Sequence, residues 1–159
     1  MATPRTKDII ALILLLVLCI GGGAVSGLLS PPGEWYAQLN KPDWTPPGWI
    51  FGPVWTALYA MMAIAAWLVW RKRSEKNVTL PLIIFAVQLA LNFAWSPLFF
   101  GLQRPDLALI DIVLLLIAIV ATIILFAPIS RSAAVLLTPY LAWVSFASVL
   151  NLALWRMNL

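Results

Sequence analysis

Long apolar runs separated by short polar segments dominate the pattern of this chain. A helix needs about 20 apolar residues to cross the hydrocarbon core of a bilayer. Because a helix satisfies its own backbone hydrogen bonds, it is the open structure that hydrocarbon permits. The pattern therefore predicts an all-α integral membrane bundle, one domain over residues 1–159, with five transmembrane helices at about 9–29, 51–70, 80–102, 107–127 and 133–155.

The first connection, residues 30–50, is the long one, and it holds five prolines and three tryptophans. Because proline fixes φ, such a segment is expected to be stiff. Its tryptophans, Trp44 among them, are typical of an aromatic belt at the membrane interface. The charged residues Glu34, Lys41 and Asp43 are placed to pair with one another within this loop.

Composition supports lipid as the solvent, since 63% of residues are hydrophobic and 10% are charged, against about 25% charged in soluble domains. The net charge is +4, but the cations lie between the apolar runs, which indicates membrane-flanking charge and no nucleic-acid partner. The chain has no histidine and one cysteine, Cys19. We therefore expect no metal site and no cofactor.

The cations also predict orientation, because cytoplasmic segments carry the excess of Lys and Arg. One side has three, Lys41, Arg104 and Arg156. The other side has seven: Arg5, Lys7, Arg71, Lys72, Arg73, Lys76 and Arg131. In a bacterial cell membrane, the most fitting location, this places the N-terminus in the cytoplasm.

The third run carries two amides at mid-membrane depth. Gln88, Asn92, Trp95 and Phe99 follow one another at helical spacing and share a face. Polar groups at this depth need partners, so the face is expected to look into the bundle. A ligand cavity and an interhelical hydrogen-bond clamp explain it equally well.

The opposite face of the same run carries Ala86, Ala90 and Ala94. Small residues four apart allow helices to approach closely. This strip predicts a homodimer through the third helix.

Two other runs also place aromatic side chains on one stripe. Trp55 and Tyr59 lie one turn apart in the second run, and Tyr140, Trp143, Ala147 and Leu150 form a broad face in the fifth. Such walls suit a flat aromatic ligand, which stacks at ring distances of roughly 4.5–7 Å, although core packing alone would also explain any single ring. The sequence has no nucleophile–base pair or phosphate loop, so an enzymatic role is an open question.

Three blocks of the sequence resemble the TspO/MBR family, the tryptophan-rich sensory proteins of bacteria and the mitochondrial translocator protein, also called the peripheral benzodiazepine receptor. The blocks run over residues 35–55 (WYAQLNKPDWTPPGWIFGPVW), 88–101 (QLALNFAWSPLFFG) and 139–151 (PYLAWVSFASVLN). The resemblance implies a five-helix bundle, often dimeric, whose first loop folds over a pocket that binds porphyrins such as protoporphyrin IX and haem. Residues 149–156 lack the tyrosine of the sterol-recognition pattern of mitochondrial members, which argues against cholesterol.

The shared faces and the resemblance together predict one set of ligand-binding residues. The set is Trp44, Trp55, Tyr59, Gln88, Asn92, Trp95, Phe99, Tyr140, Trp143, Ala147 and Leu150. Our leading hypothesis is a receptor or transporter-like membrane protein that binds porphyrins and has a sensory or tetrapyrrole-regulating role. One alternative is a light-dependent porphyrin-degrading enzyme, for which the resemblance implicates Trp55 and Trp143. A second is a structural scaffold, in which the rings only pack.

Overall fold

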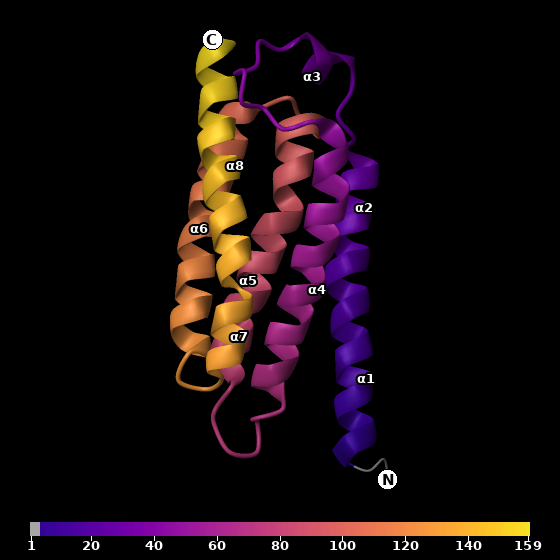
Figure 1. Ribbon diagram of the computed structural model, residues 1–159, viewed down its shortest axis with the longest axis vertical. Helices are drawn as coiled ribbons and strands as arrows, with labels where there is room; N and C mark the ends of the chain where they lie inside the picture. The colour runs from indigo at the N-terminus through magenta and orange to yellow at the C-terminus, as the bar shows by residue number, and fades with distance from the viewer. Residues whose placement is uncertain (1–3) are drawn as a thin grey trace.

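A computed structural model describes residues 4–159 as a bundle of five membrane-length helical segments (Figure 1). The prediction of an all-α membrane fold is confirmed, and residues 4–159 contain no strand. Because the number of segments is odd, the two ends of the chain lie at opposite ends of the bundle. The segments are Arg5–Leu29, Gly48–Trp70, Thr79–Gly101, Pro105–Phe126 and Arg131–Met157.

The first segment consists of α1 (Pro4–Leu16), the π-helical turn η1 (Val17–Gly21) and α2 (Gly22–Leu29). Glycines let it pack closely against two neighbours. A Cβ on Gly23 would lie 2.1 Å from a ring carbon of Tyr59, and one on Gly22 would lie 2.4 Å from a ring carbon of Phe93. The absence of a side chain at Gly23 thus lets α2 lie directly against the Tyr59 ring.

Prolines end or bend two of the other segments. Helix α5 (Thr79–Ser96) gives way to the π-helical turn η3 (Pro97–Gly101) because Pro97 has no N–H for the Phe93 carbonyl. The Ser26 hydroxyl of α2 donates to that carbonyl at 2.7 Å. The proline therefore creates the acceptor through which α2 is attached to α5.

The last two segments are α6 (Pro105–Phe126) and the pair α7 (Arg131–Leu136) and α8 (Thr138–Met157). The Ser130 hydroxyl caps α7 by accepting the Ala133 N–H at 3.3 Å. The break at Leu137 follows from Pro139, which cannot donate to the Val135 carbonyl. The Thr138 hydroxyl donates to that carbonyl instead, at 2.7 Å.

The first loop lies across one end of the bundle and contains α3 (Glu34–Gln38) and the 3-10 turn η2 (Gly48–Ile50), which leads into α4 (Phe51–Trp70) (Figure 1). The expected pairing of Lys41 with the loop acids is absent among the described residues. The Lys41 ammonium instead donates to the carbonyls of Ala37 and Leu39 at 3.1 and 3.2 Å. The Lys41 side chain thus stiffens the loop by bonding to the loop's own backbone.

The end of α8 holds the loop in place. The Asn158 side chain accepts the backbone N–H of Asn40 at 2.9 Å and donates to the Asn40 carbonyl at 3.0 Å. Trp35 and Tyr36 of α3 pack edge-on against Phe99 of η3, at centroid distances of 5.8 and 6.3 Å. The loop is fastened to the bundle at both of these places.

Candidate ligand cavity under the first loop

A cavity of about 720 Å³ lies beneath the first loop, within the range typical of small-molecule sites. Four of the helices that enclose it, α2, α4, α5 and α8, present glycines, aromatic rings and amides, while α6 supplies Ile112 and Leu115. The loop covers it with Pro32, Tyr36, Lys41, Thr45 and Pro46. Its position between helices and under a loop makes it the candidate site.

Aromatic rings form much of the cavity wall. Trp55 and Tyr59 of α4 stack at 5.4 Å with an angle of 29° between their planes. Trp95 and Phe99 stack at 4.9 Å and 21° on the α5–η3 side. Two pairs of nearly parallel rings thus present π-faces and edges to the same space, as a planar guest requires.

Below the aromatic walls, a chain of hydrogen bonds closes the cavity. The Tyr59 hydroxyl donates to Asn92 Oδ1 at 2.5 Å, and Asn92 Nδ2 donates to the Tyr140 hydroxyl at 2.8 Å. The Tyr140 hydroxyl donates to Gln88 Oε1 at 2.8 Å, and Gln88 Nε2 lies 3.8 Å from the Met62 sulfur. The two amides therefore act as an interhelical clamp, while Asn92 and Tyr59 also line the cavity.

A second polar contact fixes the orientation of Trp95. Its indole N–H donates to Asn151 Oδ1 at 3.0 Å, and Asn151 Nδ2 donates to the Pro105 carbonyl at 2.9 Å. Trp143 differs, because its buried indole N–H has no partner among residues 4–159. The Trp143 ring lines the cavity while its indole nitrogen lies within the wall, so this ring is held by packing and not by a hydrogen bond.

The mouth of the cavity carries one cation. The Lys41 ammonium lies 4.7 Å from the centroid of the Tyr36 ring, and both residues line the cavity. Burial raises the pKa of Tyr36, so this phenol stays neutral at physiological pH. Of the described charged residues of the loop, Lys41 lines the cavity, and it forms no ion pair with Glu34 or Asp43.

Eight of the eleven predicted ligand-binding residues line the cavity: Trp55, Tyr59, Asn92, Trp95, Phe99, Trp143, Ala147 and Leu150. Gln88 and Tyr140 lie below the floor, 1% and 0% exposed. Trp44 is 48% exposed, packs edge-on against Phe146 at 5.8 Å and does not line the cavity. The structure thus brings most of the predicted set together and places three residues behind or outside it.

Several lining residues carried no signal in the sequence. Ile20, Ile112 and Leu115 come from uniformly apolar stretches, in which a cavity-facing position looks the same as a lipid-facing one. Asn151 did carry a signal, because it continues the polar face of the fifth run. No three His, Cys, Asp or Glu side chains gather as metal ligands anywhere in residues 4–159.

These features define an integral membrane helical bundle with a ligand-sized cavity under a fastened loop. The model of the TspO/MBR family matches residues 13–156, and the chain belongs to this family. It is 46% identical to the tryptophan-rich protein TspO of Chlorobaculum tepidum over 155 residues. This matched stretch is 96% of this chain and 98% of that protein.

Two further relatives show the breadth of the family. The human translocator protein is 46% identical over 128 residues, which is 79% of this chain and 75% of that protein. The tryptophan-rich sensory protein of Cereibacter sphaeroides is 38% identical over 148 residues, 93% of this chain and 92% of that protein.

Proposed function

We propose that this protein is a receptor or transporter-like membrane protein that binds porphyrins, or similar flat hydrophobic molecules, in the cavity under the first loop. The observation that carries the proposal is the cavity of about 720 Å³ with stacked aromatic walls, a hydrogen-bonded floor and one cation at its mouth. The sensory and translocator names of its relatives agree with such a role.

Each part of the cavity suits a different part of a porphyrin. The macrocycle would stack on Trp55, Trp95 and Trp143. The Asn92 oxygen keeps a lone pair for a polar edge, since it accepts one hydrogen bond from Tyr59. Lys41 would pair with a propionate at the mouth of the cavity through a charge-assisted hydrogen bond, which is stronger than a neutral one.

A titration of the detergent-solubilised protein with protoporphyrin IX tests the proposal. We expect saturable quenching of tryptophan fluorescence and a shift of the porphyrin absorbance band. Trp143→Phe should weaken binding by about tenfold, because a large ring of the cavity wall is replaced by a smaller one. Trp49→Phe is the matched control, since Trp49 is 74% exposed and does not line the cavity. Absence of saturation, or equal weakening by both variants, would contradict the proposal.

The same variants separate binding from light-dependent degradation. Trp55 and Trp143 both line the cavity, which is the observation that favours the enzymatic alternative. Under illumination in air, a degrading enzyme would consume bound porphyrin faster with native protein than with Trp143→Phe at equal occupancy. Equal rates at equal occupancy would assign the loss to free photochemistry and leave binding as the function.

We also propose that the protein forms a homodimer through Ala86, Ala90 and Ala94. Ala86 and Ala90 are exposed in the single chain and Ala94 is half-buried, so the strip is open to a second copy. Ala90→Phe should convert a detergent-solubilised dimer to monomer in light scattering. Ile117→Phe on α6, at a position 62% exposed, is the control that should leave the mass unchanged.

The orientation completes the proposal. The seven-cation side is proposed to face the cytoplasm of a bacterial cell, which puts the first loop and the cavity mouth on the outer side. Labelling of intact cells with an impermeant thiol reagent should reach a cysteine placed at Asp43 in the loop and spare one placed at Ser74. The reverse pattern would invert the orientation.

A further inference from the structure

The end of the bundle opposite the cavity carries a dense group of cations at the membrane boundary. Two acids, Asp8 and Glu75, lie among them. The cations come from the start of α1 and from the connection between α4 and α5: Arg5, Lys7, Arg71, Lys72, Arg73 and Lys76. This end therefore keeps a clear positive excess.

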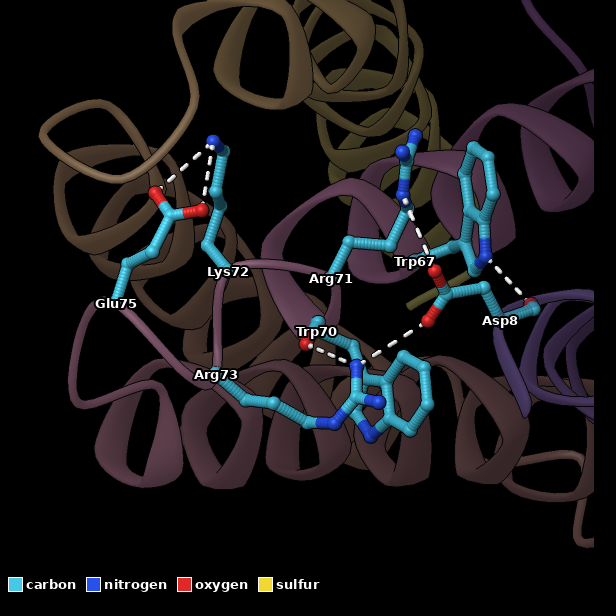
Figure 2. A network of polar contacts seen from close by, with 7 residues as sticks. All are labelled: Asp8, Trp67, Trp70, Arg71, Lys72, Arg73 and Glu75. Carbon is cyan, nitrogen blue, oxygen red and sulfur yellow. Dashed lines mark hydrogen bonds and ion pairs between the residues drawn. The ribbon is translucent and has the colours of Figure 1, made fainter. Parts of the chain in front are cut away.

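One carboxylate is shared between two of the arginines (Figure 2). Asp8 Oδ2 lies 3.8 Å from Arg71 Nε, and Asp8 Oδ1 lies 3.4 Å from Arg73 Nη1. The indole N–H of Trp67 donates to the Asp8 carbonyl at 2.7 Å, which fixes α1 against the end of α4. Because a single negative charge faces two positive ones, the cluster is not neutralised.

Arg73 has hydrogen-bonding capacity to spare. Its guanidinium carbon lies 3.3 Å from the centroid of a Trp70 ring, and its Nη1 also donates to the Trp70 carbonyl at 3.2 Å. Its Nε and Nη2 make no hydrogen bond with any described residue, and its side chain is 35% exposed. A held guanidinium with a free edge is the group that binds phosphate through two parallel hydrogen bonds.

An apolar groove of about 360 Å³ begins at the same tryptophan. It runs between the first membrane segment (α1 and η1) and α5, lined by Leu14, Leu18, Leu82, Ala86 and Leu89, with Trp70 among its walls. Ala86 leaves the space that a larger side chain would fill. Trp70 therefore belongs both to the groove and to the support of the Arg73 guanidinium.

We propose that this groove and the Arg71–Arg73 end of α4 form a binding site for one anionic phospholipid. The phosphate would bind the free edge of Arg73, and one acyl chain would lie along Leu14, Ala86 and Leu89. Basic clusters directly beside a transmembrane helix attract anionic headgroups, at about 1 kcal/mol per cation.

The charge pattern favours a lipid over a second copy of the chain in this groove. The free edge of Arg73 at the end of the groove calls for a negatively charged group. An anionic headgroup supplies that group, whereas a second copy in the same orientation presents only the same positive excess there. Of the proposed dimer strip, Ala86 lines the groove, whereas Ala90 and Ala94 lie beyond it.

Native mass spectrometry of delipidated protein in detergent tests the site, with dioleoyl phosphatidylglycerol and dioleoyl phosphatidylcholine as probes. Both lipids have the same chains, so their difference reports the headgroup. We expect one phosphatidylglycerol to remain bound preferentially. Arg73→Gln should lower its apparent affinity by about fivefold, the effect of one interfacial cation. Asp8→Asn should raise it, because the competing carboxylate is gone.

These opposite signs exclude a merely structural effect, since loosening the cluster would lower binding in both variants. Lys72→Gln is the matched control: it removes the same charge from a residue that pairs with Glu75 at 3.1 Å, away from the groove, and should change affinity less. Ala86→Phe should reduce phosphatidylglycerol binding to the phosphatidylcholine level by filling the groove. Melting curves in detergent verify that each variant is folded.

Three results would overturn the proposal. Equal retention of the two lipids would mean ordinary surrounding lipid only. Equal losses in Arg73→Gln and Lys72→Gln would mean a diffuse charge effect. Loss of dimer with unchanged lipid binding in Ala86→Phe would mean that a second copy occupies the groove.

Discussion

Helix α4 carries large side chains in one half of the bundle and small side chains in the other. Toward the first loop it carries Phe51, Trp55 and Tyr59, all of which line the cavity. Toward the basic end it carries Ala63, Ala65 and Ala66, each with 0% exposure. Large rings hold neighbouring helices apart, whereas alanines let them approach. The size of side chains along one helix thus decides which half is hollow and which is sealed.

The two halves also differ in what closes them. In the sealed half α4 packs against α1 and α7, and Cys19, Met62 and Val69 are completely buried there. In the hollow half the enclosure depends on the loop and on hydrogen bonds between amides and phenols. We infer that the sealed half contributes most of the stability and that the hollow half is free to serve a ligand.

Overpacking the sealed half should have the largest effect. Ala63→Leu inserts three heavy atoms where no space exists, so we expect a loss of about 2–3 kcal/mol in unfolding free energy. Ala57→Leu is the control, because Ala57 is exposed on the same helix and should change stability by less than about 0.5 kcal/mol. Thermal unfolding in detergent measures both. Similar melting of the two variants would remove the distinction between the halves.

A smaller effect is expected where α2 meets the hollow half. Gly23→Ala forces the Tyr59 ring to move, because the added Cβ would lie 2.1 Å from it, and we expect a loss of about 1–2 kcal/mol together with weaker porphyrin binding. Gly21→Ala has no heavy atom within 4 Å of the added Cβ and should be neutral or slightly stabilising. A stable Gly23→Ala protein with unchanged affinity would contradict the close packing at Tyr59.

The hydrogen-bonded floor distinguishes a ligand site from a scaffold. Asn92→Leu removes the acceptor of the Tyr59 hydroxyl and the amide that donates to the Tyr140 hydroxyl, which keeps Gln88 as its acceptor. We therefore expect a loss of about 1 kcal/mol and a several-fold loss of porphyrin affinity. A scaffold protein would instead gain stability and keep its affinity. Unfolding curves and porphyrin titrations on the same preparation give both quantities.

The fastening of the loop should have the smallest effect on stability. Asn158→Ala removes two exposed hydrogen bonds to Asn40, which contribute about 0.5 kcal/mol. We expect a small change in melting but faster release of porphyrin in stopped-flow dilution. Met157→Ala, at an exposed neighbour, is the control. An unchanged release rate would show that the loop is held by its aromatic contacts alone.

The sequence predicts the five helices because hydropathy and the absence of unpaired backbone in lipid leave little choice. Proline positions also explain the turn at Pro97 and the break before Pro139. The same reasoning does not predict how far the cavity extends along the helices. Gln88 and Asn92 share a face one turn apart, yet only Asn92 lines the cavity.

The difference between these two amides arises from other helices. The Tyr140 hydroxyl bonds both amides, and the Met62 sulfur lies beside Gln88. Periodicity within α5 assigns a direction to each side chain but not the distance to what stands opposite. Ile112 and Leu115 were not predicted for the same reason, because no residue pattern within α6 indicates which positions lie beside the cavity.

The burial of Cys19 has a practical consequence for spectroscopy. It is the sole cysteine of the sequence, and its side chain is 0% exposed within the sealed half. A thiol-reactive spin label or dye should therefore leave the native chain unmodified and attach only where a new cysteine is introduced. Pairs of labels, one on the loop and one at the end of α8, would then follow opening of the cavity as a distance, without first replacing a buried residue.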